Sequence, residues 1–358
     1  MLESNGMNIV FREYLQMKSI IKQGRYISII ISIIILTVDK SVSQVSKNHQ
    51  LINNRKRIGY EDTAHLQSGC LKLVVATNVP YGKVHKGGYS GVSELYLAQG
   101  DNRNFFVPRY AGLNYEHIFS GNSKTYNWNP YETRIDSMKL IRLSDRKVML
   151  EQSRTKNWPL KSSISYELID NSIDFVFSAI PLEDVWKKYG YVGIFFASYI
   201  DSPSEKGINF IGRSRAGKGS PKPRWIYHLP EVHGLSANHR PAGSTWDPSL
   251  DSSGFPISLV TGLSDLEYLY PFYYGVSHDN VFIMMFENPG KDGELRFAQS
   301  PDGGGDTNPA WDFIYFRKNY KVGKKFSFRA RAVYKKFEGK DDVIKIYETW
   351  SGQKVIKL

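Results

Sequence analysis

The strongest constraint on the fold is a succession of short β-rich runs, separated by Gly, Pro, Asn and Asp, that starts at Leu71. Asp145-Arg146 and Asp170-Asn171 join neighbouring runs as hairpin loops. Many strands at roughly ten-residue spacing predict an all-β protein with a large antiparallel sandwich or barrel. The runs are 71–79, 93–99, 138–144, 147–153, 163–169, 172–180, 191–200, 280–286, 294–300, 311–318 and 325–337.

Two of these runs alternate with the period of a half-buried strand. The residues that share the apolar face are Ile173, Phe175, Phe177 and Ala179 in the first, and Phe326, Phe328, Ala330, Ala332 and Tyr334 in the second. Short helices are expected only at Leu182–Tyr189 and Asp341–Trp350. Because the sequence shows neither a repeat nor a linker after residue 70, we expect one domain over 69–358.

The N-terminal segment has the pattern of a secretion signal. Ile27–Val38 is almost wholly apolar, basic residues precede it, and small residues including Ser43 follow it. As a helix this run would span about 18 Å, less than the ~30 Å hydrocarbon core of a membrane. We therefore expect a signal peptide over 1–43, with Met17 as the natural start. The mature protein would be secreted or periplasmic in a bacterium, with no membrane attachment after cleavage.

Composition narrows the partners. The polar stretch 44–68 is expected to be a leader without strands. The net charge of +12 suits an acidic polysaccharide, nucleic acid or a membrane surface, or it has no specific partner. Export argues against nucleic acid. Cys70 is the single cysteine, which excludes an internal disulfide and a cysteine-ligated metal site.

The order of features resembles the galactose mutarotase-like β-supersandwich, the fold of aldose epimerases and of domains in glycoside hydrolases and polysaccharide lyases. Tyr131–Ile180 resembles the central hairpins of that fold, with Lys147–Gln152 and Ser165–Ala179 as paired strands. Val192–Asp201 resembles the strand that carries a catalytic His in epimerases, and 308–334 resembles the closing strands. The resemblance implies a β-supersandwich with a few short helices and a carbohydrate site in a cleft on the concave sheet face.

One departure concerns the activity. Where an epimerase carries its catalytic His, this chain has Ala197-Ser198-Tyr199. Mutarotation needs an acid and a base on either side of the sugar ring oxygen and anomeric hydroxyl. The fold expectation is unaffected, whereas an aldose epimerase becomes an alternative rather than the leading prediction.

The first candidate site is the polar cluster within 106–121. It contains Arg109, Tyr110, Asn114, Glu116 and His117. Arg can hold a carboxylate or sulfate through two hydrogen bonds, His or Tyr can act as a base, and Asn and Glu can recognise hydroxyl groups. The alternative is a packed β-loop whose polar groups satisfy one another.

The second candidate is the loop-like segment 225–246, which contains His233, His239, Arg240 and Trp246. The histidine spacing does not match a helical zinc motif, but a Zn²⁺ site assembled from loops stays open. A sugar-binding or catalytic loop is a second interpretation of this segment, and a structural polar loop is a third. Further along the chain, Asp302–Asn308 offers oxygen ligands for Ca²⁺, or it is a glycine-rich turn.

Aromatic residues are dense, at 14% of the chain, and their rings stack on the apolar faces of sugars. Tyr274 and Trp311 are candidates for such stacking. Asp312 lies where the resemblance places a carboxylate near the sugar, so it is a candidate base.

Together these features predict an exported protein that binds and processes a poly- or oligosaccharide, with an acidic glycan as one option. A lyase would use His or Tyr as base, with Arg109, Arg240 or a bound cation stabilising the enolate. A hydrolase would use two carboxylates, Glu116 and Asp312. A non-catalytic carbohydrate-binding protein is the main alternative. The expected catalytic residues are His117, His233, Arg109, Glu116 and Asp312; the expected substrate-binding residues are Tyr110, Asn114, His239, Arg240, Trp246, Tyr274 and Trp311.

Overall fold

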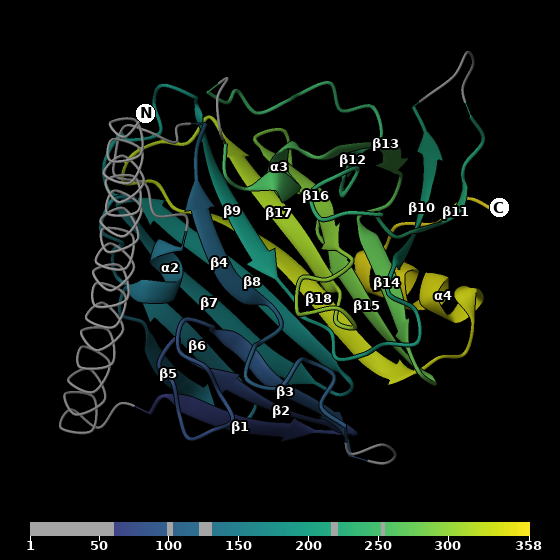
Figure 1. Cartoon of the computed structure of the whole chain (residues 1–358), viewed down its shortest axis with the longest axis horizontal. Coiled ribbons are helices and arrows are strands. Elements are labelled where there is room, and N and C mark those ends of the chain that lie inside the picture. The colour runs from purple at the N-terminus through teal and green to yellow at the C-terminus, as the bar shows by residue number, and fades with distance from the viewer. Residues whose placement is uncertain (1–60, 99–102, 122–130, 216–220, 252–254) are drawn as a thin grey trace, which may run out of the picture. The chain divides into compact units, whose positions relative to one another are not determined.

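The structure is a computed structural model that describes residues 61–98, 103–121, 131–215, 221–251 and 255–358. Its strands assemble into two sheets (Figure 1). The signal peptide predicted over 1–43 lies outside the described residues. The strands are β1 Thr63–Ser68, β2 Leu71–Ala76, β3 Gly91–Leu97, β4 Asn114–Phe119, β5 Lys139–Ser144, β6 Lys147–Gln152, β7 Leu160–Ile169, β8 Ser172–Pro181, β9 Tyr191–Ala197, β10 Ile208–Ser214, β11 Arg224–His228, β12 Asn238–Pro241, β13 Leu263–Tyr268, β14 Phe272–Ser277, β15 Asn280–Phe286, β16 Gly293–Ser300, β17 Ala310–Lys318 and β18 Phe326–Lys336.

The small sheet has the order β1-β2-β3. Its first strand corrects the prediction that 44–68 contains no strand. Ala64 and Leu66 alternate with more exposed polar neighbours and are buried in the core. Two apolar positions at a period of two are enough for an edge strand when a paired strand supplies the rest of the apolar surface. Residues 44–60 lie outside the described part of the chain.

The large sheet has the order β4-β9-β17-β16-β12-β13-β10-β14-β15-β18-β8-β7-β6-β5, and β11 pairs with β10. Its pairs are antiparallel except β12 with β13, which is parallel. The two predicted hairpins are present, because β5 pairs with β6 and β7 with β8. Every run predicted as a strand overlaps one, and the predicted all-β supersandwich is confirmed.

The main core lies between two parts of this sheet that face each other. The ring centroids of Phe196 in β9 and Phe175 in β8 are 5.0 Å apart, and those of Phe313 in β17 and Phe328 in β18 are 5.9 Å apart. The apolar faces predicted for 172–179 and 325–337 are buried in this core. Strands β4, β9, β17 and β16 therefore turn one face to the core and the other away from it.

The three described helices are α2 Glu132–Ile135, α3 Ser258–Thr261 and α4 Lys340–Ser351. Helix α4 confirms the prediction for 341–350, with Val343 and Tyr347 buried. The helix predicted at 182–189 is wrong, because this segment forms turns around the buried Trp186, which stacks on Trp158. A single isolated helical turn nucleates poorly, so the burial of one large ring decides its conformation.

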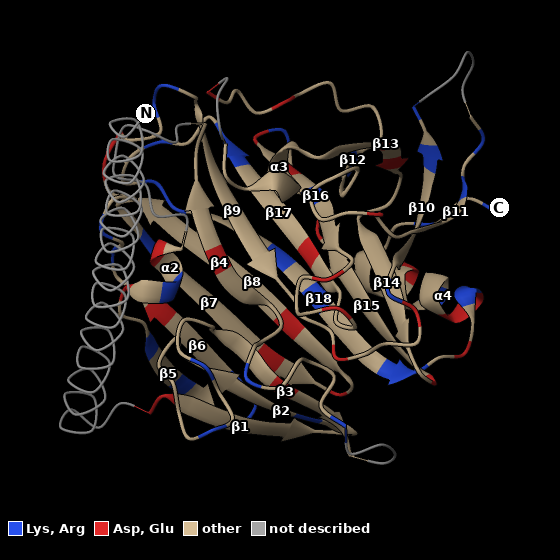
Figure 2. Ribbon diagram, viewed as in Figure 1, with Lys and Arg blue, Asp and Glu red and all other residues tan. Residues whose placement is uncertain are grey.

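Charge follows the same division between strands and connections. Figure 2 shows Lys, Arg, Asp and Glu mainly at strand ends, in loops and on α4, with a few charged positions inside strands of the large sheet, one of them in β4. Isolated charges inside buried strands are costly unless they are paired. Those in β4 and β17 mark the candidate site. Among the described residues, no helix has the length and apolar character needed to span a membrane.

Candidate functional site

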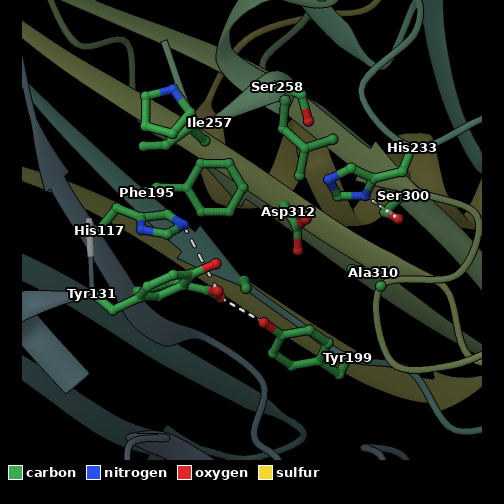
Figure 3. Close-up of a pocket in the computed structure, with 15 residues that line it drawn as sticks. His117, Tyr131, Phe195, Tyr199, His233, Ile257, Ser258, Ser300, Ala310 and Asp312 are labelled. Atoms are coloured by element: carbon green, nitrogen blue, oxygen red, sulfur yellow. Dashed lines mark hydrogen bonds and ion pairs between the residues drawn. The ribbon is translucent and has the colours of Figure 1, made fainter. Parts of the chain in front are cut away.

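A cavity of about 190 Å³ lies on the face of β4, β9, β17 and β16 that is turned away from the core (Figure 3). The loop before α3 and the glycine-rich turn before β17 border it. The lining residues are Glu116, His117, Tyr131, Phe195, Ala197, Tyr199, His233, Pro256, Ile257, Ser258, Leu259, Ser300, Gly303, Ala310 and Asp312.

Strand alternation supplies the floor of this pocket. In β9 and β17, Phe196 pairs with Phe313, and both rings belong to the main core. Their neighbours Ala197 and Asp312 point to the opposite face, into the pocket. Ala197 is small, so its side chain occupies little of the pocket floor.

A β-bulge brings two polar side chains of β4 into the same pocket. Tyr115 pairs with Phe196 and His117 with Phe195, so Glu116 is an extra residue between these pairs. A bulge re-aims side chains that strict alternation would send to opposite faces. Glu116 and His117 consequently both line the pocket, and His117 Nε2 lies 3.7 Å from Glu116 Oε1.

The Glu116 carboxylate is surrounded by donors. Its Oε1 accepts from Arg134 Nη1 at 3.3 Å, and its Oε2 accepts from the Tyr199 hydroxyl at 2.7 Å and from Asn114 Nδ2 at 3.2 Å. The residue is only 6% exposed. An ionised carboxylate is an acceptor only, so three donors on two oxygens suit the charged form of a buried group.

Asp312 is in a different environment. It is 1% exposed, and its Oδ1 accepts one hydrogen bond, from the Ser198 backbone N–H at 2.9 Å. Burial raises the pKa of the Asp312 carboxyl well above its usual range; the Ser198 hydrogen bond opposes this rise and the charge of Glu116 adds to it. Burial therefore favours the protonated form of Asp312, whereas the Glu116 carboxylate beside it accepts hydrogen bonds from three donors.

Tyr199 completes this part of the site. Burial, followed by the charge of Glu116, raises the pKa of the Tyr199 hydroxyl well above its usual range. The phenol therefore stays protonated and donates its hydrogen to Glu116. This hydrogen bond restrains the carboxylate, and a phenolate base is disfavoured at this position.

His233 reaches the pocket from the loop between β11 and β12. Its Nδ1 lies 2.8 Å from Ser300 Oγ, and Ser300 in turn donates to Asp302 Oδ1 at 3.0 Å. These two hydrogen bonds fix the orientation of the imidazole, and the His233 side chain is otherwise exposed. His233 lines the pocket on the side opposite His117 and Tyr131 (Figure 3).

The structure brings together four of the predicted catalytic residues: Glu116, His117, His233 and Asp312. The fifth, Arg109, is exposed and does not line the pocket.

Two predicted substrate-binding residues adjoin the pocket without lining it. The side-chain amide of Asn114 donates a hydrogen bond to Glu116, and the ring centroids of Tyr110 and Tyr199 are 5.2 Å apart.

The remaining predicted residues serve other parts of the fold. His239 is fully buried against Phe210, and burial lowers its pKa well below its usual range, so it is neutral. Arg240 pairs with Asp247 at 3.0 Å. Trp246 packs on aromatic rings in a neighbouring part of the same sheet face. None of these three lines the pocket.

Tyr274 and Trp311 are core residues. Trp311 is fully buried, and its indole N–H donates to the backbone oxygen of Lys206 at 2.8 Å. Tyr274 is 2% exposed and contacts Trp225 edge to face. Since Trp311 and Asp312 are adjacent in one strand, only one of them can face the pocket.

Several residues of the site were not among the predicted ones, including Tyr131 and Tyr199 in the pocket lining and Arg134 beside Glu116. Tyr131 and Arg134 lie at the one-turn helix α2, where Arg134 binds Glu116 and also donates from Nε to the Gly88 backbone oxygen at 2.9 Å. A single helical turn leaves no periodic signal in the sequence. Their position depends on packing between segments that are distant along the chain.

The predicted Ca²⁺ or Zn²⁺ site stays a prediction. Within the described ranges, no three His, Cys, Asp or Glu side chains are grouped so that they could hold a metal ion. In particular, His233 and Asp302 are connected through Ser300.

No protein-family model matches the sequence, and no curated protein matches it. Solved structures do. A galactose mutarotase-like protein from Lactobacillus casei is 10% identical, with a TM-score of 0.42 over 76% of this chain and 100% of that chain. An α-N-acetylgalactosaminidase from Bifidobacterium bifidum is 9% identical (TM-score 0.41; 80% of this chain, 38% of that one). A heparan sulfate lyase from Pedobacter heparinus is 13% identical (TM-score 0.35; 75% and 34%). These are the kinds of protein that the sequence pattern resembles, and the likeness concerns the fold alone.

Proposed function

We propose that the pocket binds one sugar residue of a glycan and cleaves its glycosidic bond by acid–base catalysis. The observation that carries the proposal is the pair of buried carboxyl groups, Glu116 and Asp312, in contrasting environments. Glu116 accepts from three donors, whereas burial raises the pKa of Asp312. Two carboxyl groups in such contrasting environments are the usual arrangement of an acid and its partner base.

Each group then has a defined role. Asp312 donates its proton to the oxygen that leaves when the glycosidic bond breaks. The Glu116 carboxylate acts at the anomeric carbon, either as nucleophile or by activating water. The two residues belong to strands on either side of β9, whose backbones are about 10 Å apart, or two strand spacings. Side chains that reach over Ala197 from both sides can flank a sugar ring.

The size of the cavity supports a single ring. At about 190 Å³ it is smaller than the ~300–1,000 Å³ of pockets that take drug-sized ligands. His117 and His233 supply polar contacts at its edge, and Ile257 and Leu259 supply apolar ones. This mixture suits a ring with hydroxyl groups around its rim and apolar faces.

A second candidate, an aldose epimerase, is favoured by the position of His117. Although β9 lacks the expected His, the bulge in β4 brings His117 to the pocket, opposite Phe195 of β9. An imidazole and a carboxyl group on either side of a ring could move the protons that mutarotation requires.

Product analysis distinguishes these functions. The purified protein is incubated with neutral and uronate-containing oligosaccharides, and with the α-anomers of free aldoses. We expect new reducing ends without the ultraviolet absorbance of an unsaturated uronate, which is the signature of hydrolysis. That absorbance would instead indicate a lyase, and faster loss of optical rotation with free aldoses alone would indicate an epimerase. Binding without any turnover would refute all three activities in favour of a binding protein.

Replacing His233 by Ala is expected to lower kcat/KM by about 10–100-fold, because one hydrogen-bonding contact to the sugar is lost. The thermal midpoint should stay within about 1 °C of the parent, since the ring is exposed and surface substitutions have small effects on stability. A matched control is His65→Ala, an exposed histidine of β1 in the small sheet. Equal activity in the two variants would remove His233 from the site.

A further inference from the structure

Three tyrosines form a continuous aromatic cluster that extends from the pocket to the accessible ring of Tyr110. Tyr199 lines the pocket, and its ring lies edge to face with Tyr89 and Tyr110, at 5.6 and 5.2 Å between centroids. Tyr89 and Tyr110 are themselves stacked at 4.6 Å with an interplanar angle of 19°. Tyr89 is buried beneath, while Tyr110 is half-buried and offers an accessible ring.

Cations gather on the same surface. Lys86 Nζ lies 5.8 Å from the ring centroid of Tyr89 and 5.6 Å from that of Tyr110. The backbone N–H of Lys86 donates to the Arg109 oxygen at 2.9 Å, so the two residues are neighbours. Both side chains are exposed, and in the described part of the chain neither forms an ion pair with a carboxylate. We call Lys86, Tyr89, Arg109 and Tyr110 the aromatic ledge.

Arg134 connects the ledge to the pocket. Its guanidinium lies 4.0 Å from the ring centroid of Tyr89 and 3.3 Å from Glu116 Oε1. Arg134 thus forms an ion pair with Glu116. Lys86 and Arg109 form none with the acidic residues that the structure describes. A negative group would be repelled by Glu116 inside the pocket and attracted by the two cations on the ledge.

We propose that the aromatic ledge is a second sugar subsite, which selects a residue carrying an anionic group, a carboxylate or a sulfate. This rests on the proposed function, because the ledge would bind the sugar that neighbours the one in the pocket. The ring of Tyr110 offers a stacking surface for the apolar face of that sugar. Lys86 and Arg109 would bind its anionic group through charge-assisted hydrogen bonds.

Calorimetric titration of the intact chain tests this with three oligosaccharides of equal length: neutral galactan, galacturonate oligomer and sulfated galactan. We expect at least one anionic oligomer to bind more tightly than the neutral one, with a margin that shrinks as salt is added. Lys86→Gln should weaken binding of the anionic oligomer by about tenfold and leave the neutral one unchanged. Comparing the two anionic oligomers identifies which group the ledge prefers.

Lys324→Gln is the matched control, because this exposed lysine lies in the turn after β17, at the opposite end of that strand from the pocket. It should bind all three oligomers like the parent. If the neutral oligomer binds as tightly as both anionic ones, or if Lys86→Gln has no effect, the ledge proposal is overturned while the proposed function stands. If none of the three binds and no glycan is turned over, both fail.

Discussion

Replacing Asp312 by Asn is expected to lower kcat by about 10²–10⁴-fold, the usual contribution of one general acid or base. The amide keeps the shape of the side chain and can still accept the hydrogen bond from the Ser198 N–H. It has no proton to give to a leaving oxygen at neutral pH. Initial rates on the oligosaccharide that the parent cleaves, measured with substrate well above KM, provide the test.

The same substitution has an opposite effect on stability. The folded-state pKa of Asp312 is raised above the unfolded value of about 3.9, so the folded chain holds a proton that the unfolded chain releases. The stability that this group supplies is complete below about pH 4 and is lost as the pH rises toward the folded pKa. Asn does not titrate, so the variant should become more stable than the parent by a margin that grows from about pH 4 upward.

Urea unfolding at several pH values measures this margin. Asp306→Asn is the matched control, because Asp306 is exposed in the glycine-rich turn near the pocket. Its activity and its pH dependence of stability should follow the parent. An Asp312→Asn protein that keeps full kcat would exclude Asp312 as the proton donor, whatever its stability.

The clearest strand predictions came from runs in which apolar residues recur at every second position, the period of a strand. Runs such as 172–180 and 325–337 alternate because one face lies on the core and the other is more accessible. Strand β4 shows no such alternation, since all six of its residues are buried and Asn114, Glu116 and His117 belong to the site. The polar residues of β4 interrupt the apolar pattern of a strand, so the sequence predicted a polar cluster there. Strands β11 and β12 were likewise hidden in a histidine-rich segment that was expected to be loop.

Only part of the candidate site was predicted, because the sequence analysis did not apply strand alternation to neighbouring candidates. Asp312 and Trp311 were both assigned to it, although neighbours in one strand face opposite sides. The same argument separates His239 from Arg240 in β12. In contrast, adjacent Glu116 and His117 both reach the pocket, because a bulge breaks the alternation. The position of a bulge depends on how two strands pair, which one segment of sequence does not determine.

Arg134 was not predicted as a site residue, although it pairs with Glu116. Replacing Arg134 by Met should be strongly destabilising. The variant keeps most of the volume but leaves Glu116 buried without its cation, and it removes the donor to the Gly88 oxygen. Breaking a buried pair by removing one partner costs about 3–5 kcal/mol. Because the Arg134 side chain is 18% exposed, we expect about 2–3 kcal/mol in the free energy of unfolding, together with a loss of turnover.

A double variant separates the charge effect from packing. In Glu116→Gln/Arg134→Met no unpaired charge is left, so most of the lost stability should return while turnover stays absent. Arg142→Met is the control, since Arg142 meets Glu61 at 4.0 Å with both side chains exposed, and surface pairs contribute about 0–1 kcal/mol. An Arg134→Met protein as stable as Arg142→Met would show that Glu116 does not depend on this cation. Tyr199 and Asn114 alone would then compensate the charge of Glu116, and the stabilising role assigned to Arg134 would have to be withdrawn.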